Sequence, residues 1–282
     1  MARDTFIAAF VLLLAGGVVL VASLVVSAVT RGARGLREHQ AWRALWAPLV
    51  PGWCVIAAFV GWGVVDPDDD EVIRVRTLIV AGFIGLIWAR ALVRAFLSFR
   101  KRHDGALLFT SGLVAPRVHV DARVRAVLED AVLEAALAHE RAHVAHRDPL
   151  RIWLAQFVTD LQWPLPGSKR RLARWLEALE VARDDEARLG GARGADLAHA
   201  ILTVAKLTVG TGENAACATL AGNPLDLRAR IERLLRDEPP SIAPGWPWTW
   251  SVAFAFAVTA FGLAGGVLGG EPLLDFLAGC GV

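Results

Sequence analysis

The segment LAHERAHVAHRD, residues 137–148, contains His139 and Glu140 followed by His143, the HExxH pattern. On a helix, residues four positions apart share a face, so both imidazoles can reach one metal ion. The intervening Glu140 then lies beside the open coordination position, where it can act as a general base on a water molecule. Because HExxH also occurs by chance on surface helices, a metal site requires a third ligand from elsewhere in the chain.

The third ligand is expected from the acidic residues of a predicted helix over residues 169–189. These residues are Glu177, Glu180, Asp184, Asp185 and Glu186. Glu180 and Asp184 are four positions apart, so one can bind metal while the other contacts a ligand histidine and fixes its tautomer. The alternative is a solvated acidic face that pairs with the arginines of the same segment, Arg174, Arg183 and Arg188. Spacing alone leaves both interpretations open.

His146 is a rival third ligand because it shares a helix face with His139 and His143. At a rise of about 1.5 Å per residue, His146 lies roughly 10 Å from His139 along the axis. Metal–nitrogen bonds of about 2 Å do not bridge that distance, so we expect His146 to be exposed or at a membrane surface. The other histidines lack metal-like spacing and are expected to be structural or solvated: His39, His103, His119 and His199. An assisting role for His199 stays open.

Composition indicates membrane segments. The chain has 282 residues, of which 55% are hydrophobic, whereas a soluble domain is typically about 45–50% apolar. Four apolar runs, 6–29, 45–65, 77–97 and 249–270, are long enough to be predicted as transmembrane helices. Arg90 and Arg94, near the end of the third run, are expected to snorkel toward lipid headgroups. Tryptophans near the proposed boundaries, among them Trp42 and Trp46, are typical of an aromatic belt.

The charges that flank these runs predict a topology. Basic residues follow the first and third runs and acidic residues follow the second, so the positive-inside rule places both termini outside. We therefore expect a mainly α integral membrane protein with three spans in 1–101, a cytosolic domain in 102–246, and a fourth span with a short outer tail in 247–282. That domain is predicted to be α+β and mostly helical. Its predicted elements are two short strands around Gly112 and Pro116 and helices over 123–146, 150–161, 169–189, 196–209 and 225–236.

Charge and cysteine content exclude two further classes of function. The formal net charge is only +2, which gives no basis for direct nucleic-acid binding. Cys54, Cys217 and Cys280 are far apart and odd in number, so neither a disulfide framework nor a CxxC metal site is available.

Four segments together resemble the BlaR/MecR-type membrane metallopeptidases, a family of antibiotic-sensing signal transducers. They are GLVAPRVHV at Gly112–Val120, LAHERAHVAHRDPL at 137–150, ALEVARDDEA at Ala178–Ala187 and PLDLRARIERLL at Pro224–Leu235. The resemblance implies a zincin-like domain in which Glu180 is the third ligand of a zinc ion (Zn2+). It also implies that Asp184 holds a ligand histidine, and that the protein is a multi-pass protein of the bacterial plasma (inner) membrane with its catalytic domain in the cytosol.

The chain departs from that family at two points. Only twelve residues follow the fourth apolar run, where family members that sense β-lactams carry an extracellular penicillin-binding domain. A signal is therefore expected from a separate sensor protein or through the short outer loops. Arg141 follows the presumed catalytic glutamate, where zincin helices often have an uncharged residue. Because Arg141 points about 100° away from Glu140 on a helix, we expect it to face solvent.

These observations predict a membrane-embedded zinc endopeptidase. His139, His143 and Glu180 are expected to hold zinc, and Glu140 to act as general base and then to protonate the leaving amine. An extended peptide is expected to add to the strand edge near Leu107–Val120. By resemblance, the substrate is a cytosolic protein and a candidate transcriptional repressor.

Three alternatives stay open. The first is a membrane quality-control zinc protease, which shares HExxH and a downstream Glu-x-x-x-Asp; the short interval between His143 and Glu180 favours the BlaR/MecR-type family instead. The second is a non-hydrolytic transducer or scaffold that keeps zinc only for structure. The third is a helical membrane protein with an accidental HExxH.

Overall fold

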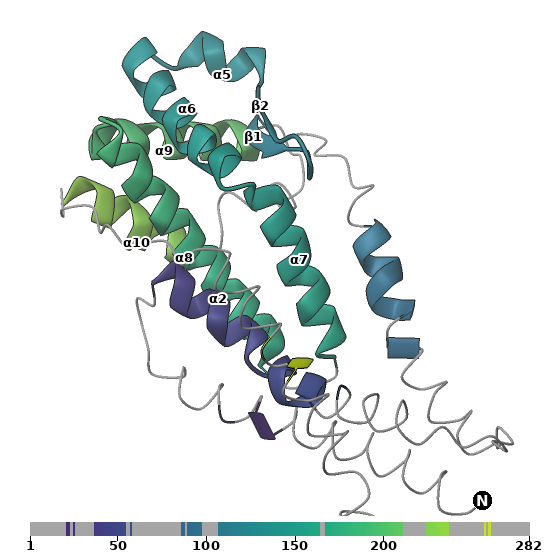
Figure 1. Cartoon of the computed structure of the whole chain (residues 1–282). Coiled ribbons are helices and arrows are strands. Elements are labelled where there is room, and N and C mark those ends of the chain that lie inside the picture. Colours follow the sequence, from purple (N-terminus) through teal and green to yellow (C-terminus); the bar gives the residue numbers. More distant parts are fainter. Residues whose placement is uncertain are drawn as a thin grey trace, which may run out of the picture.

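The computed structural model describes residues 37–54, 89–97, 107–163, 167–210 and 224–236, together with a few isolated positions. Helices dominate these residues, and one short hairpin accompanies them (Figure 1). In chain order the elements are α2 (Glu38–Trp46), β1 (Leu108–Ser111), β2 (Arg117–Val120), α5 (Ala122–Val127), α6 (Asp130–Ala145), α7 (Asp148–Leu161), α8 (Ser168–Leu189), α9 (Gly194–Gly210) and α10 (Pro224–Leu235).

The hairpin formed by β1 and β2 confirms the two strands predicted around Gly112 and Pro116. The strands are antiparallel, with Leu108 opposite Val120 and Ser111 opposite Arg117. Gly112 begins the connecting turn with a φ of 103°, and a Cβ there would lie 2.6 Å from the carbonyl oxygen of Ala115. Only glycine adopts this conformation without strain, so Gly112 allows the chain to reverse sharply between β1 and β2.

The helix predicted over 123–146 is two helices, α5 and α6. Leu128 and Glu129 have extended backbones, with ψ values of 134° and 152°, and interrupt the helical path. The break allows Leu128 to be buried beside Val124 and Val132 in a cluster that includes residues of the hairpin and of α9. The hydrophobic periodicity of the sequence predicts one continuous helix here. Burial of these three apolar side chains favours the break instead.

The helices α6, α8, α9 and α10 share a second apolar cluster, which contains Ala135, Ala187, Leu197 and Leu234. Gly194, at the start of α9, allows the end of α10 to approach closely, because a Cβ at this position would collide with the carbonyl oxygen of Leu234. The four helices predicted after α6 are all present, with boundaries within a few residues of those expected. The helix α10 packs against α9, and ion pairs from Arg230 and Arg233 link it to α8 (Figure 1).

The helix α2 packs against α7 and α8. Leu45 of α2 and Trp175 of α8 both have no exposed surface, and Val158 of α7 completes the contact. The ring centroids of Trp42 and Trp175 are 4.9 Å apart. A segment more than ninety residues before the HExxH motif is therefore part of the core that α7 and α8 form.

No helix among the described residues is both long and apolar enough to cross a membrane. The predicted fold, a mainly α integral membrane protein with four spans, is therefore wrong. The predicted location, a multi-pass protein of the bacterial inner membrane with both termini outside, is contradicted by the same finding. Most of the predicted spans, 6–29, 45–65, 77–97 and 249–270, lies outside the described residues.

The described parts of these segments show why the pattern misled. Trp42 and Trp46, assigned to an aromatic belt, pack against the core formed by α2, α7 and α8. Arg90 and Arg94, expected to snorkel, instead contact Asp160 of α7, with Arg94 Nε 3.0 Å from its carboxylate. The helix α8 is long enough to span a bilayer at 22 residues, but charged residues occur throughout it. Contacts within the protein therefore account for the positions of Trp42, Trp46, Arg90 and Arg94.

Candidate metal centre

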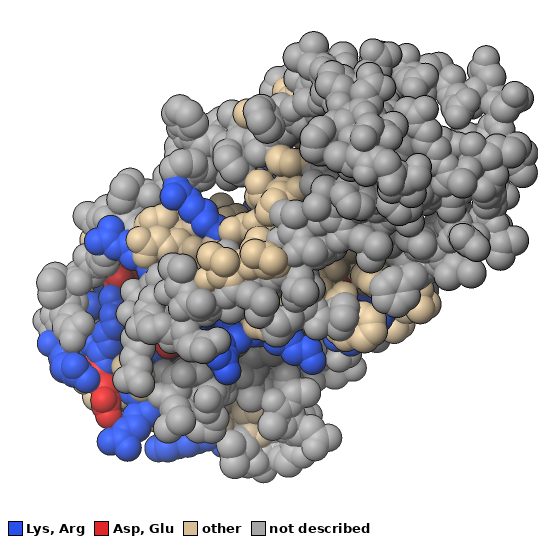
Figure 2. Space-filling view, turned by 90° about the horizontal axis from the view of Figure 1, so that it is seen from below, with Lys and Arg blue, Asp and Glu red and all other residues tan. Residues whose placement is uncertain are grey.

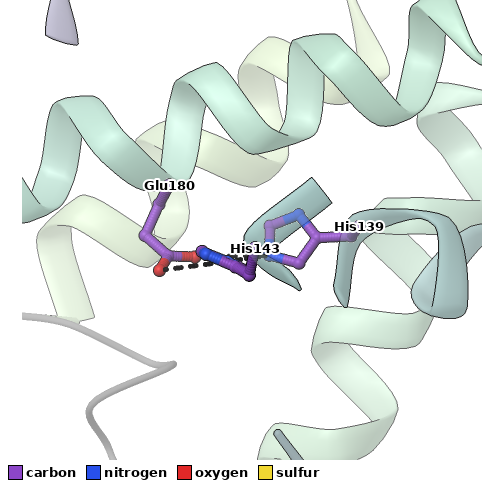
Figure 3. A group of neighbouring side chains, drawn as sticks. All are labelled: His139, His143 and Glu180. Carbon is purple, nitrogen blue, oxygen red and sulfur yellow. Dashed lines mark hydrogen bonds and ion pairs between the residues drawn. The ribbon is translucent and has the colours of Figure 1, made fainter. Parts of the chain in front are cut away.

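Two helices bring three potential metal ligands together (Figure 3). His139 and His143 lie one turn apart on α6, and their Nε2 atoms are 3.1 Å apart. Glu180 of α8 directs its carboxylate at both rings, with Oε2 3.5 Å from Nε2 of His139 and Oε1 3.8 Å from Nε2 of His143. Two imidazole nitrogens and a carboxylate oxygen therefore converge on one point.

The opposite nitrogen of each imidazole faces a buried carboxylate. Nδ1 of His143 lies 2.8 Å from Oδ2 of Asp148, and Nδ1 of His139 lies 3.0 Å from Oδ1 of Asp184. The second contact is short but poorly aligned for a hydrogen bond. Neither carboxylate has any solvent exposure. A proton on each Nδ1 leaves each Nε2 free to bind a metal ion, which is the usual arrangement of metal-binding histidines.

The connection between α6 and α7 explains the position of Asp148. Arg147 has a left-handed backbone, with a φ of 52°, which is uncommon for a residue other than glycine. This conformation turns the chain between the two helices, and Pro149 suits the first turn of α7. Asp148 therefore returns to the HExxH face only five residues after His143.

Glu140 is buried and contacts the hairpin. The hydroxyl of Thr110, on β1, donates to Oε2 of Glu140 at 2.7 Å and also lies 3.2 Å from the backbone oxygen of Glu140. Because both contacts come from one short hydroxyl on β1, they restrict the positions that the Glu140 side chain can adopt. The hairpin therefore positions the candidate general base beside the two histidines.

Two arginines neutralise the buried acids. Arg183 of α8 donates to Asp148 from Nε at 2.5 Å and from Nη2 at 3.2 Å. Burial alone would raise the pKa of Asp148, but His143 and Arg183 outweigh burial and hold this pKa well below its usual range. Arg230 of α10 contacts Asp184 in the same two-pronged manner. Its guanidinium and the imidazole of His139 hold the pKa of Asp184 below its usual range, against the effect of burial.

The same neighbours set the charge state of two candidate ligands. Burial opposes ionisation of Glu180, but Arg230 and the two histidines prevail and lower its pKa to about 2. Burial also opposes a charged His139, yet the adjacent carboxylates of Asp184 and Glu180 raise the pKa of this imidazole to about 9. Glu180 is therefore ionised at neutral pH. His139 carries a proton at neutral pH when no cation occupies the site.

This set of donors suits zinc. Structural and catalytic zinc ions are bound by imidazole nitrogen and carboxylate oxygen at about 2 Å, and catalytic ions keep one position open. One potential ligand atom from each of His139, His143 and Glu180 contributes to the cluster, and these three atoms lie within 4.8 Å of one another. Each imidazole has a buried carboxylate within 3.0 Å of its Nδ1, where zinc-binding histidines usually have a partner. The residues present therefore fit a zinc ion with three protein ligands.

The site residues expected from sequence lie together: His139, Glu140, His143, Glu180 and Asp184. Their chemical roles stay predictions. The alternative of a solvated acidic face does not fit Asp184, which has no exposed surface. The expectation that His146 lies apart is confirmed, because its ring is exposed and contacts Glu186 at 2.9 Å.

Arg141 and His199 are both exposed. The side chain of Arg141 is 62% exposed and lies 3.3 Å from Glu134, so it faces solvent as expected. His199 is exposed on α9 and is not among the residues that converge on the candidate ligands.

Sequence reasoning missed four contributors to the site. Asp148 ends the HExxH segment and had no site role attached to it, and Arg183 was expected only as a surface partner of acids. Arg230 lies in the arginine-rich segment that carries part of the family resemblance, but no role was attached to it. Thr110 had no signal beyond its position in a predicted strand.

Comparison of the chain with protein-family models, with curated proteins and with solved structures finds no match. The resemblance to BlaR/MecR-type metallopeptidases therefore stays a prediction.

Proposed function

We propose that this chain is a zinc-dependent endopeptidase whose metal ligands are His139, His143 and Glu180. One observation carries the proposal: both histidines direct Nδ1 at a fully buried carboxylate, while both Nε2 atoms converge with Glu180. A chance HExxH on a surface helix does not require two buried acids behind its histidines. A zinc ion bound there would polarise a scissile carbonyl and acidify a water molecule.

Glu140 has the position required of a general base. It precedes His143 by three residues on α6, is buried, and is held by Thr110. Its carboxylate would accept a proton from the attacking water and then deliver that proton to the amide nitrogen that leaves. Arg141 points to solvent and takes no part in this transfer.

The hairpin supports a peptide rather than a small molecule as the substrate. Among the described residues β1 pairs only with β2, so no described strand covers its other edge. Since Thr110 of β1 touches Glu140, an extended peptide that adds to this edge would pass the base and the histidines. By resemblance to BlaR/MecR-type peptidases, a repressor protein is the first substrate class to test.

The proposal is tested in the native cell by comparing the protein N-termini produced with the wild-type chain and with Glu140→Gln. Glu134→Gln is the matched control, because Glu134 lies on the same helix but its side chain is 65% exposed. A protein shortened with wild type and with Glu134→Gln, but intact with Glu140→Gln, would support the proposal and identify the substrate.

Zinc analysis of the three purified proteins separates the alternatives. Equal zinc in all three with no new N-terminus under any condition would favour a non-hydrolytic protein with a structural zinc ion. Zinc absent from wild type would favour an accidental motif.

A further inference from the structure

Arg230 differs from most basic residues of this chain because it is buried within the candidate metal centre. Figure 2 shows a group of lysines and arginines on the surface of the described part of the chain. Arg228, two residues earlier on α10, has a side chain that is 80% exposed. By contrast, the side chain of Arg230 is 9% exposed. A buried guanidinium needs several acceptors to offset the loss of water.

The acceptors of Arg230 are Asp184, which lies behind His139, and the candidate ligand Glu180. Its Nε and Nη2 atoms donate to both oxygens of Asp184, at 2.5 and 2.7 Å. Its Nη1 donates to Oε2 of Glu180 at 2.9 Å. The same Glu180 oxygen lies 3.5 Å from Nε2 of His139, and Nη2 of Arg230 lies 3.4 Å from that nitrogen. One rigid planar group therefore contacts a candidate ligand and the carboxylate behind another ligand.

The position of Arg230 depends on how α10 docks. Ile231 and Leu234 pack in the apolar cluster that α10 shares with α6, α8 and α9. Gly194 permits the close approach of α9 to Leu234. A second ion pair, between Arg233 and Asp185, joins α10 to α8 outside the candidate ligand set. Arg233 and Arg230 thus link the same two helices, but only Arg230 reaches the acids of the metal centre.

We propose that Arg230 is a positioning residue of the metal centre, which directs Glu180 toward the two imidazoles and keeps Asp184 against His139. The inference rests on the proposed zinc site. Two effects of the guanidinium oppose each other: its positive charge repels a zinc ion, whereas its hydrogen bonds preorganise the two carboxylates. Because the planar guanidinium donates two hydrogen bonds to Asp184 and one to Glu180 at once, the positioning effect dominates.

The test is zinc affinity of the full chain, measured by competition with a chromophoric chelator, for wild type, Arg230→Met, Arg230→Lys and Arg233→Met. Loss of a residue that orients ligands typically lowers metal affinity about 10- to 100-fold, and we expect this for Arg230→Met. Arg230→Lys keeps the charge but not the planar fork, so an intermediate loss is expected. Arg233→Met should bind zinc within about twofold of wild type, because Arg233 contacts Asp185 and neither Glu180 nor Asp184.

The visible spectrum of the cobalt-substituted protein gives a second readout that does not depend on peptidase activity. We expect Arg230→Lys to shift this spectrum and Arg233→Met to leave it unchanged. Equal or tighter zinc binding by both Arg230 variants would overturn the inference while leaving the zinc site intact. If Arg230→Met does not fold, Arg230→Lys alone decides: reduced affinity supports positioning, and wild-type affinity contradicts it. Absence of zinc binding by wild type would overturn both proposals.

Discussion

Nδ1 of His143 lies 2.8 Å from Oδ2 of Asp148, a residue with no solvent exposure at the start of the next helix. Asp148 also accepts hydrogen bonds from Arg183 and from Arg151. Arg151 in turn pairs with Glu38 of α2. One carboxylate therefore connects a candidate metal ligand with α7, with α8 and, through one further residue, with α2.

Asp148→Asn tests this connection. We expect zinc affinity to fall about 10- to 100-fold, because His143 loses the charge that orients and polarises it. The free energy of unfolding should also fall by about 1.5–3 kcal/mol, because the buried Arg183 keeps Glu186 as a counter-ion but loses its charge-assisted hydrogen bonds to Asp148. Chelator competition and urea unfolding measure the two effects. Asp160→Asn, on the same helix but paired with Arg90 and Arg94, should leave zinc affinity unchanged. Equal zinc affinity in the two variants would refute the assignment of Asp148.

Thr110→Val should impair the reaction without affecting the metal. The isosteric change removes the hydrogen bond to Glu140, and a hydrogen bond to a charged group contributes about 1.5–3 kcal/mol. We expect kcat on a cleaved peptide to fall about tenfold, with KM and zinc affinity near wild type. Thr110→Ser retains the hydroxyl and should restore most of kcat. A serine variant as slow as the valine variant would show that the hydroxyl has no positioning role.

Zinc affinity should rise with pH. The pKa of His139 is raised to about 9 from the usual histidine value of 6.5, so the proton stabilises the metal-free fold fully below pH 6.5. That stabilisation is lost as the pH rises through about 9. Zinc requires the unprotonated nitrogen, so the apparent affinity should increase by up to about tenfold per pH unit between these values. Competition titrations from pH 6.5 to 8.5 measure this slope. Asp184→Asn should flatten it, because Asp184 raises the pKa of His139; a flat wild-type profile would contradict the account.

Leu45→Ala tests whether α2 belongs to the core that α7 and α8 form. Leu45 has no exposed surface, and truncation of a buried leucine to alanine typically costs about 2–5 kcal/mol. We expect a loss of this size in the free energy of unfolding, measured with urea. Val114, which is 88% exposed, provides the matched control, and Val114→Ala should change stability by less than about 0.5 kcal/mol. Equal effects of the two substitutions would mean that α2 does not pack as described.

The relationships that could be predicted from the sequence are those that residue spacing sets within one helix or one hairpin. His139 and His143 share a helix face because they are four residues apart, and the same rule brings Glu180 and Asp184 together on α8. The hairpin was predictable from Gly112 and its flanking strands. These relationships depend on local backbone geometry, which residue spacing encodes directly.

The remaining features depend on tertiary contacts. Asp148 reaches His143 only because Arg147 adopts a left-handed backbone, which no pattern of side chains indicated. Arg230 is 46 residues from Asp184, and its place is set by the docking of α10. The start of the second hydrophobic run was misassigned for a related reason: Leu45 is buried against α7 and α8, but hydropathy does not distinguish lipid from a neighbouring helix as the covering partner.

The most direct test of the central claim is cleavage of a proteome-derived peptide library by the purified, zinc-loaded chain. Wild type, Glu140→Gln and the control Glu134→Gln are compared by mass spectrometry at equal zinc occupancy. The account predicts new peptide termini with wild type and Glu134→Gln, and none above background with Glu140→Gln. Cleavage that persists in Glu140→Gln, or a zinc-loaded wild type that cleaves no peptide, would contradict it.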